Sequence, residues 1–367
     1  MRKNILFFLS DEGYGHMIRQ RAIIQEFLQS NKKYRITIIT GNRINDLKEF
    51  FLDKVSYFKI HNLIETQKTY GALDLKKTKK IFKNWYVREK HWKNKIIKNF
   101  KKVDLIVSDS VPQAFQLKKI YKCVAVNISH FSWDWFYYIH YKKDDKILKK
   151  LKEYYKLSDK FYYLPYTPKE ILVNYPSNQK VNFVSYGKFV IRKLSKKKIN
   201  CLIMDNGTRS LSSNIESVLI SLTKLKKFHF FIGIDTLSES SKKIISENSN
   251  LFPISGLKNM HSYIASVDFV IARGGYNTLT ECLILRKPSL LMYETNNKEI
   301  LYNISLLKKN NFCEIIYQSD FKKNINKKIL NFVKYKKNII FRNLVKKDFK
   351  SNGSKQIYNF LKEKIKN

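Results

Sequence analysis

A short polar turn, Arg273-Gly274-Gly275-Tyr276-Asn277-Thr278, lies between two apolar stretches. The pattern predicts a buried strand over residues 269–272, a turn, and a helix that opens on Thr278 and carries Glu281 in its first turn. A helix N-terminus presents backbone N–H groups and partial positive charge, and glycines let an anion approach the backbone closely. The segment therefore predicts a site for an anionic group, with phosphate as the first candidate.

Two side chains of this segment differ in the chemistry they offer. The Thr278 hydroxyl can donate a hydrogen bond to a phosphate, whereas an ionised Glu281 carboxylate only accepts hydrogen bonds. Beside a phosphate, Glu281 is therefore better suited to paired donors such as ribose hydroxyls. An ordinary strand–turn–helix connection with a helix-favouring glutamate explains the same residues without a ligand.

A second candidate for chemistry closes the first glycine-bearing loop. An apolar run over 4–9 leads into Ser10-Asp11-Glu12-Gly13-Tyr14-Gly15-His16, and a helical pattern follows to about residue 29. The loop lacks the third glycine of a dinucleotide fingerprint. Histidine exchanges a proton readily near neutral pH, so His16 is the first candidate for proton transfer, with Asp11 and Glu12 as alternatives. The other interpretation of His16 is an exposed residue at a helix start.

The elements that must position these residues alternate along the chain. Strands are expected over 4–9, 35–40, 55–60, 103–109 and 123–129, and then over 200–204, 228–234, 251–254, 269–272 and 289–293. Helices are expected between them, including one long amphipathic helix over 76–102, and helices over 211–225, 260–265 and 354–366. This alternation predicts an α/β fold with doubly wound parallel sheets, whose ligands gather beyond the carboxyl ends of the strands. The loop ending at His16, Asp109 and His130 all lie at such ends.

Length and composition are sufficient for two domains. The chain has 367 residues, of which 44% are hydrophobic, so each of two domains can have its own core. The basic stretch 187–198 is interpreted as the connection between them. We expect a first domain over 1–186, a second over 187–345, and a C-terminal helix within 346–367 that packs back near the domain junction. Two such halves facing each other would create a cleft lined by the strand-end loops.

The charge balance is strongly basic. The chain has 71 Lys and Arg against 30 Asp and Glu, a formal net charge of +41. Nucleic acid, an anionic membrane or an acidic substrate could each explain this charge, but the lysines are spread along the chain, which indicates a compositional bias. Because no nucleic-acid-binding module is recognised, we expect no nucleic-acid partner. The Lys-rich segment 76–102, with Trp85, Tyr86 and Trp92, is interpreted as a solvated helix face or as a surface for an anionic membrane.

The cysteines and the first residues indicate the compartment. Four cysteines lie far apart and show no metal-binding or disulfide spacing: Cys123, Cys201, Cys282 and Cys313. The first apolar run is too short for a signal peptide, and no run approaches the length of a membrane span. We therefore expect a reducing, cytoplasmic setting, which includes the inner face of the membrane.

Three motifs together resemble those of the GT-B glycosyltransferases, in the branch of the peptidoglycan N-acetylglucosaminyltransferase. They are Gly13-Tyr14-Gly15-His16, Asp205-Asn206-Gly207-Thr208-Arg209 and the segment 272–281, with a looser match over 293–299 and at Asn303. The stretch 127–135 and the ending Asn352-Gly353-Ser354 resemble a subgroup that includes the sugar-binding-like half of arabinokinases. The resemblance covers nearly the whole chain and is more specific in its second half. It implies two Rossmann-like domains, the second of which holds a nucleotide-sugar donor, a UDP-sugar.

The resemblance also implies roles for individual residues. Those implied at the diphosphate and ribose are Gly274, Gly275, Asn277, Thr278 and Glu281, joined by Gly15 and by Asn206, Gly207, Thr208 and Arg209 from the other side. Those implied at the uracil are in the loop 256–260, including Leu257 and Met260, and those implied at the sugar hydroxyls are Asn297, Glu299 and Asn303. The family usually has a Gln near the position of Glu299, so the donor sugar stays open.

Catalysis of an inverting transfer needs a base that takes the proton of the acceptor hydroxyl. The resemblance implies that His16 is this base and that Asp109 orients it; the alternative for Asp109 is a cap on the helix that begins near Pro112. For His130 we expect packing beside Phe131 and Trp133, with a place in the lining of the cleft as the alternative. Trp133 and Trp135 are interpreted as core residues, with an acceptor platform as the alternative.

Metal-free chemistry fits the sequence, because the Asp-x-Asp motif of metal-dependent transferases does not occur. We expect no metal and no cofactor beyond the donor, with the helix terminus and Arg209 stabilising the departing diphosphate. The acceptor is expected to be a glycan, a lipid-linked molecule or a small molecule. A hydrolase of the nucleotide sugar and a non-catalytic nucleotide-sugar-binding subunit are the alternative functions.

Overall fold

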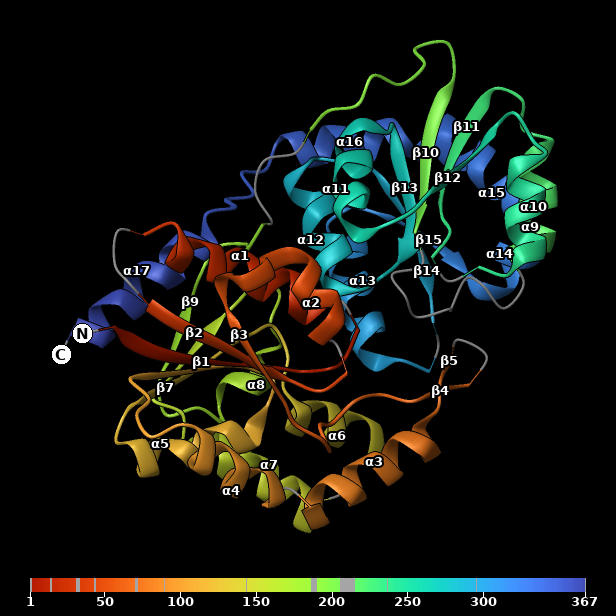
Figure 1. Ribbon diagram of the computed structural model, residues 1–367. Helices are drawn as coiled ribbons and strands as arrows, with labels where there is room; N and C mark the ends of the chain where they lie inside the picture. Colours follow the sequence, from red (N-terminus) through yellow and green to blue (C-terminus); the bar gives the residue numbers. More distant parts are fainter. Residues whose placement is uncertain are drawn as a thin grey trace. The chain divides into compact units, whose positions relative to one another are not determined.

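Two compact units make up the chain in the computed structural model (Figure 1). The structure describes residues 2–13, 15–30, 34–42, 44–69, 72–88, 90–142, 144–185, 190–204, 215–235, 237–294 and 296–366. The first unit consists of Met1–Gln67, Asp74–Tyr186 and Lys350–Asn367, and the second of Lys68–Leu73 and Gly187–Phe349. Each unit has its own parallel sheet.

The sheet of the first unit has seven parallel strands in the order β3-β2-β1-β6-β7-β8-β9. Their bounds are β1 Lys3–Leu9, β2 Tyr34–Thr40, β3 Ser56–Lys59, β6 Leu105–Asp109, β7 Val124–Ser129, β8 Lys160–Tyr163 and β9 Asn178–Lys180. The central strands β1 and β6 are nearly continuous runs of buried apolar side chains, as expected for strands covered on both faces.

Helices cover both faces of this sheet (Figure 1). They are α1 Gly15–Leu28, α2 Ile44–Phe51, α3 Leu75–Arg88, α4 His91–Asn99, α5 Leu117–Tyr121, α6 Trp133–Tyr141, α7 Lys146–Lys156, α8 Lys169–Leu172 and α17 Gly353–Lys366, with 3₁₀ turns over Leu52–Lys54 and Pro112–Gln116. Two short strands, β4 Lys68–Thr69 and β5 Ala72–Leu73, pair antiparallel with each other.

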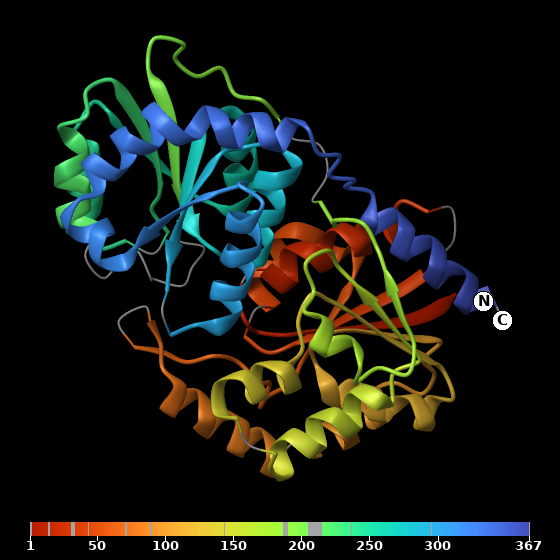
Figure 2. The same cartoon turned by 180° about the vertical axis from the view of Figure 1, so that it is seen from behind.

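The C-terminal helix α17 belongs to the first unit, although the preceding residues belong to the second. It packs against α1 (Figure 2), where the rings of Phe27 and Tyr358 lie 5.0 Å apart and the Ser354 hydroxyl donates to Glu26 over 3.0 Å. The chain therefore crosses between the units four times, because Lys68–Leu73 also belongs to the second unit, and its last helix packs against α1 in the first.

The sheet of the second unit has six parallel strands in the order β12-β11-β10-β13-β14-β15. Their bounds are β10 Ile199–Met204, β11 Phe228–Gly233, β12 Leu251–Ile254, β13 Phe269–Arg273, β14 Ser289–Tyr293 and β15 Glu314–Tyr317. The helices are α9 Ile215–Thr223, α10 Glu239–Ser246, α11 Leu257–Ser266, α12 Tyr276–Ile284, α13 Lys298–Lys309, α14 Gln318–Lys323, α15 Ile325–Asn331 and α16 Lys337–Val345, with a π-helical turn over Phe332–Lys336. The prediction of doubly wound parallel sheets is confirmed.

Both sheets have a point where the strand order reverses. In the first unit, β1 lies between β2 and β6, and Leu9 is the register partner of Asp109. In the second unit, β10 lies between β11 and β13, and Met204 is the register partner of Ala272. Ligands of open α/β sheets bind beyond the carboxyl ends of the strands at such reversals. Ligands are therefore expected beyond the carboxyl ends of β1 and β6 in the first unit and of β10 and β13 in the second.

One prediction about secondary structure is wrong. The segment 76–102 is not a single helix but two, α3 and α4, and Lys90 is the residue that precedes α4. No Pro or Gly marks the break, so the periodicity of the sequence continues through it. The two helices bury different anchors: the Trp85 indole donates to Gln113, whereas the ring of Trp92 packs on Phe8.

Candidate active site

His16 and Asp109 meet at the strand-order reversal of the first unit. His16 is the second residue of α1, and Asp109 is the last residue of β6. His16 Nδ1 lies 2.7 Å from Asp109 Oδ1, and both side chains are buried. The structure thus brings together the two residues that the sequence marked as a catalytic pair, 93 positions apart in the chain.

Arg19 holds the same carboxylate from the next turn of α1. Its Nη2 atom lies 2.7 Å from Asp109 Oδ1, and its Nε atom donates to Asp109 Oδ2 over 3.0 Å. Gln20 donates to Oδ2 as well, over 3.0 Å. Burial alone would raise the pKa of Asp109, but the charges of Arg19 and His16 and their hydrogen bonds hold it well below its ordinary value. Asp109 is therefore an ionised carboxylate with fixed donors.

The charge of Asp109 decides which nitrogen of His16 carries the proton. An ionised carboxylate only accepts hydrogen bonds, so the short contact to Asp109 requires a proton on Nδ1. Arg19 Nη2 also lies 3.1 Å from Nδ1, but a guanidinium only donates, and its hydrogens are directed to Asp109. This assignment leaves Nε2 of neutral His16 as the nitrogen that can accept a proton.

Asp109 does not cap the helix that follows it. The 3₁₀ turn that begins at Pro112 has no side-chain cap on Val111, whose backbone N–H donates to the Ser108 hydroxyl instead. Ser110 is in the left-handed region, with φ of 59°. The chain therefore turns sharply directly after Asp109.

The other candidates in the first unit have different surroundings. His130 is buried, with Nδ1 3.4 Å from Arg19 Nη1 and its ring beside Phe131. Trp133 and Trp135 are 1% and 8% exposed, so these indoles belong to the core. Asp11 accepts from Thr40, Gly41 and Asn42, and Glu12 accepts from Thr66, so both carboxylates hold loops in place.

The turn after β13 is the segment of the second unit that was predicted to bind an anionic group. The helix α12 begins at Tyr276, two residues before the predicted start at Thr278, and Gly275 is the residue that precedes it. A Cβ on Gly274 would lie 2.4 Å from Ile304 Cγ1 of α13, so packing requires glycine there. A Cβ on Gly275 would meet no atom within 4 Å, and its φ of −69° is open to any residue. Since the fold does not require Gly275, its lack of a side chain is consistent with a ligand that approaches the backbone.

The two glycines therefore predict opposite results when each is replaced by alanine. Gly274→Ala should lower the free energy of unfolding by about 1–3 kcal/mol, because the added methyl overlaps Ile304. Gly275→Ala should leave stability nearly unchanged and weaken nucleotide binding, because the methyl lies where a phosphate would approach. Urea unfolding and calorimetric titration with UDP measure both effects. Equal UDP affinity of Gly275→Ala and the unmodified chain would contradict this role for the turn.

Glu281 is held by a histidine from the neighbouring helix. It is 7% exposed, and its Oε1 atom lies 2.7 Å from Nδ1 of His261 on α11. The loop before α11 also has a fixed shape, since Gly256 has a φ of 77°, which favours glycine, and its N–H donates to Asp235. His261 therefore connects the carboxylate of α12 to the helix that starts at this loop.

A buried ion pair fixes the strand ends beside the turn. Arg273 is the last residue of β13, and Glu294 follows β14. The two form a bidentate ion pair, in which Arg273 Nε donates to Glu294 Oε1 and Nη2 donates to Oε2 over 3.0 Å. Asn297, predicted to contact the sugar, caps α13 by accepting from the N–H groups of Glu299 and Ile300. Asn303 is buried on the same helix, and Glu299 is partly exposed.

The other residues predicted to bind the nucleotide-sugar donor follow β10 in the sequence or belong to α11 and α12. Asn206, Gly207, Thr208 and Arg209, which follow β10 in the sequence, lie outside the described residues. Leu257 is the first residue of α11, and Met260, one turn later, is partly exposed. Thr278 is buried and Asn277 partly exposed in the first turn of α12.

Comparison with known proteins agrees with the fold described above. Residues 206–358 match the model of the glycosyltransferase family 28 C-terminal domain. The whole chain superposes on MurG of Acinetobacter baumannii with a TM-score of 0.61 at 12% identity, covering 99% of this chain and 100% of that one. It superposes on the UDP complex of Arabidopsis thaliana UGT89C1 with a TM-score of 0.68 at 11% identity, again covering 99% and 100%. This chain has the GT-B fold, and its residues 206–358 match the family 28 C-terminal domain.

One curated relative shares part of its sequence with this GT-B protein. It is the UDP-N-acetylglucosamine--N-acetylmuramyl-(pentapeptide) pyrophosphoryl-undecaprenol N-acetylglucosamine transferase of Sulfurihydrogenibium sp. (strain YO3AOP1), 24% identical over 165 residues. The match spans 44% of this chain and 45% of the relative, less than half the length of each. The predicted resemblance to GT-B proteins of this branch is confirmed.

Sequence reasoning missed three residues that shape the site of this GT-B protein: Arg19, His261 and Glu294. Each contacts a residue of the predicted motifs from a different element: Arg19 contacts Asp109, His261 contacts Glu281, and Glu294 contacts Arg273. Arg19 alone carried a signal, because it lies three positions after His16 and so on the same helix face. Nothing in the sequence pairs His261 with Glu281 or Arg273 with Glu294.

Proposed function

We propose that this chain transfers a sugar from a UDP-sugar donor to a hydroxyl group of an acceptor, with inversion at the anomeric carbon and without a metal ion. The observation that carries the proposal is the buried pair of His16 and Asp109 at the strand-order reversal of the first unit. The family 28 model match over the second half supports a nucleotide-sugar donor. MurG and the UDP complex of UGT89C1 share the fold.

His16 acts as the base in the proposed step. Its Nε2 atom takes the proton of the acceptor hydroxyl while the oxygen forms a bond to the anomeric carbon from the face opposite the leaving group. The bond between that carbon and the diphosphate oxygen breaks, and UDP leaves with the bonding electrons. Asp109 keeps the His16 proton on Nδ1 and stabilises the imidazolium that forms.

The second unit supplies the donor site in this proposal. Gly274, Gly275, Asn277 and Thr278 surround the N-terminus of α12, whose partial positive charge stabilises the departing diphosphate. Arg209, outside the described residues, is proposed as a second source of positive charge. Glu281 accepts hydrogen bonds from the ribose hydroxyls, and His261 holds the carboxylate in place.

Replacing Glu281 with alanine tests the donor site. We expect UDP affinity to fall about 10- to 100-fold, since two hydrogen bonds to a charged group are lost. Isothermal titration of UDP into the purified chain measures the change, and thermal unfolding shows whether the variant is folded. Glu239→Ala, an exposed change on α10 of the same unit, is the matched control. Unchanged affinity in Glu281→Ala would remove the ribose contact from the proposal.

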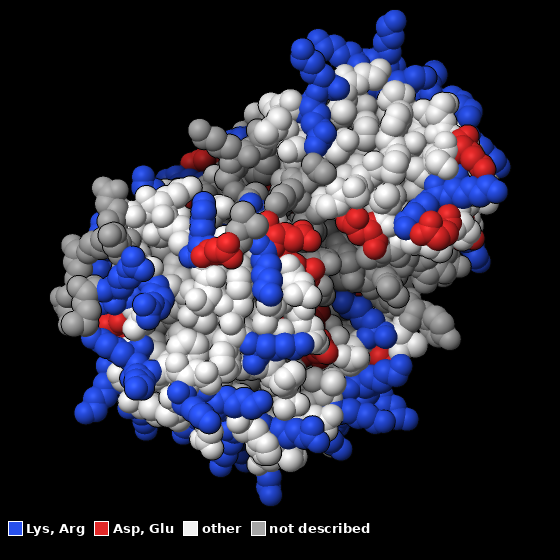
Figure 3. Space-filling view, in the orientation of Figure 1, with Lys and Arg blue, Asp and Glu red and all other residues white. Residues whose placement is uncertain are grey.

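We also propose a cytoplasmic protein that makes peripheral contact with an anionic membrane. All four cysteines are free, as expected in a reducing compartment. Among the described residues, no helix combines the length and hydropathy that a membrane crossing requires. Exposed lysines on α3 supply a basic face, and the name of the curated relative gives a pyrophosphoryl-undecaprenol acceptor. In Figure 3, however, Lys and Arg side chains are scattered over the visible surfaces of both units.

Vesicle binding tests this contact. We expect the chain to co-sediment with phosphatidylglycerol vesicles at low salt and to be released as salt rises, because screening weakens the attraction. Replacing Lys80 and Lys83 of α3 with glutamate should weaken binding, whereas the same change at the exposed Lys346 and Lys347 should weaken it less. Equal losses in the two pairs would indicate an attraction due to net charge alone.

A further inference from the structure

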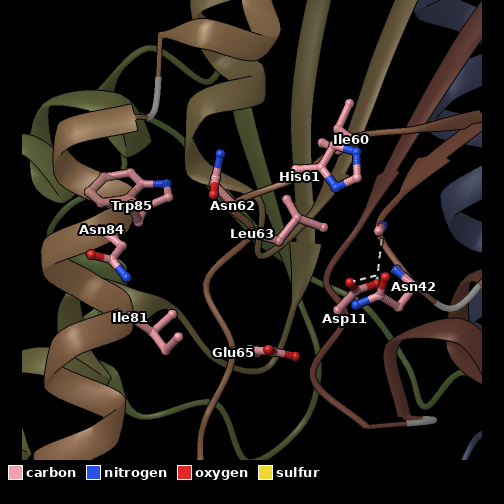
Figure 4. Close-up of a pocket in the computed structure, with 11 residues that line it drawn as sticks. Asp11, Asn42, Ile60, His61, Asn62, Leu63, Glu65, Ile81, Asn84 and Trp85 are labelled. Atoms are coloured by element: carbon pink, nitrogen blue, oxygen red, sulfur yellow. Dashed lines mark hydrogen bonds between the residues drawn. The ribbon is translucent and has the colours of Figure 1, made fainter.

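A small pocket opens beyond the carboxyl ends of β1, β2 and β3 in the first unit. Its volume is about 190 Å³. Asp11 and Asn42 form one side, and Ile81, Asn84 and Trp85 of α3 form the opposite side (Figure 4). The segment that follows β3 lines the rest and contributes His61, Asn62, Leu63 and Glu65. The pocket lies entirely within the first unit and contains neither His16 nor Asp109.

The lining selects against anions. It contains two carboxylates, Asp11 and Glu65, three side-chain amides and one imidazole, and none of the lining residues described is Lys or Arg. The absence is informative in a chain with 71 Lys and Arg among 367 residues. A phosphate or carboxylate ligand would meet like charge from these two carboxylates, and no Lys or Arg among the described lining residues would offset it. A ligand with hydroxyl or ammonium donors would meet acceptors.

Asp11 keeps acceptor capacity while it holds the wall of the pocket. Its Oδ1 atom accepts from the Thr40 hydroxyl over 2.9 Å and from the Gly41 N–H over 3.1 Å, and its Oδ2 atom accepts from the Asn42 N–H over 2.8 Å. A carboxylate has about four lone-pair positions, so Oδ2 retains one. A Cβ at Gly41 would lie 2.0 Å from Oδ2, so glycine is required for this close approach. The carboxylate is thus fixed in position before any ligand arrives.

Size and polarity together define the ligand class. The pocket is below the range of about 300–1,000 Å³ that is typical of sites for drug-sized ligands, so it suits one ring and not an extended chain of sugars. Amide groups donate and accept, carboxylates accept, and Leu63 and Ile81 provide apolar contact for the C–H face of a ring. We propose that this pocket binds one neutral or amino-bearing sugar ring. Its assignment to the acceptor, as the ring held near the reacting hydroxyl, rests on the proposed function.

Saturation-transfer NMR with the full chain tests the pocket directly. The probes are glucose, N-acetylglucosamine, glucosamine, glucuronate and glucose 6-phosphate, each at millimolar concentration. We expect signals from the neutral and amino sugars, and signals at least several-fold weaker from the two anionic ones. Asn84→Trp, which fills the mouth of the pocket, should abolish the signals. Asn94→Trp, the same substitution at an exposed position on α4 outside the pocket, should leave them unchanged.

A second variant tests the carboxylate. Glu65→Gln keeps the shape of the side chain and removes its charge, so the preference for glucosamine over glucose should fall several-fold. No signal from any neutral or amino sugar, equal signals from the anionic sugars, or signals that persist in Asn84→Trp would each overturn the proposal. UDP titration distinguishes failure of the pocket proposal from failure of the proposed function. A chain that binds these sugars but not UDP would support the sugar pocket and contradict the nucleotide-sugar donor site.

Discussion

Replacing His16 with alanine should lower kcat for sugar transfer by about 10²- to 10⁴-fold and leave UDP affinity unchanged. The loss follows from the removal of Nε2, the atom that takes the proton of the acceptor hydroxyl. UDP affinity should persist because His16 is not among the residues proposed to bind the donor. The fold should persist as well, because Arg19 and Gln20 still donate to Asp109. Steady-state kinetics with calorimetric titration of UDP measure both quantities.

The matched control for this change is His91→Ala, an exposed histidine at the start of α4. Its kcat should equal that of the unmodified chain. Turnover of His16→Ala within a factor of two of the unmodified chain would remove His16 from the mechanism. A fall in UDP affinity that matches the fall in kcat would indicate that the change acts on binding and not on proton transfer.

Replacing Asp109 with asparagine should lower the free energy of unfolding by about 3–5 kcal/mol at pH 7. The change leaves the guanidinium of Arg19 buried without its counter-charge. An amide at this position can also donate to His16 Nδ1 and favour the tautomer with the proton on Nε2, so kcat should fall too. Urea unfolding followed by circular dichroism measures the stability. Asp159→Asn, whose carboxylate is partly exposed and paired with Lys118, should cost about 1 kcal/mol or less.

The pH dependence of stability separates the charge of Asp109 from its shape. Its pKa is depressed in the folded chain, so its contribution is complete above the unfolded value of about 4 and is lost as pH falls below that value. The stability gap between the unmodified chain and Asp109→Asn should therefore shrink between about pH 4 and pH 2. A gap that stays constant over this window would show that packing, and not charge, accounts for the loss.

The sequence allowed the fold to be predicted where apolar runs were continuous. The strands β1, β6 and β7 are buried on both faces, so their composition alone marks them. The strands β8, β9 and β15 were not predicted, because they are short and lie at or near the sheet edges, where polar residues such as Lys160, Asn178 and Glu314 enter the pattern. The break between α3 and α4 was not predicted, because no Pro or Gly marks it, although Trp85 and Trp92 on its two sides pack on different partners.

Residues of the candidate site were predicted where their role depends on residue type within one loop. They were missed where their role depends on contacts between separate elements. His16 stands out because it lies at the start of a helix after a glycine-bearing turn, and Glu281 because it lies in α12, the helix that follows the turn at Gly274 and Gly275. Arg19, His261 and Glu294 act through charge pairs across elements. Arg19 and His261 lie on helices, where a polar residue is ordinarily expected to face solvent, and Glu294 follows a strand without a local signal for its partner. The carboxylate-lined pocket was missed because its walls come from three strand ends and α3.

The central claim is that this chain moves a sugar from a nucleotide donor to an acceptor. The most direct measurement is release of nucleoside diphosphate from UDP-, GDP- and dTDP-sugars, with and without a panel of hydroxyl acceptors, with mass spectrometry of the products. We expect release from a UDP-sugar that depends on an acceptor, and an acceptor product heavier by one sugar residue. Release at the same rate without any acceptor, with free sugar as the product, or no release from any donor, would contradict this account.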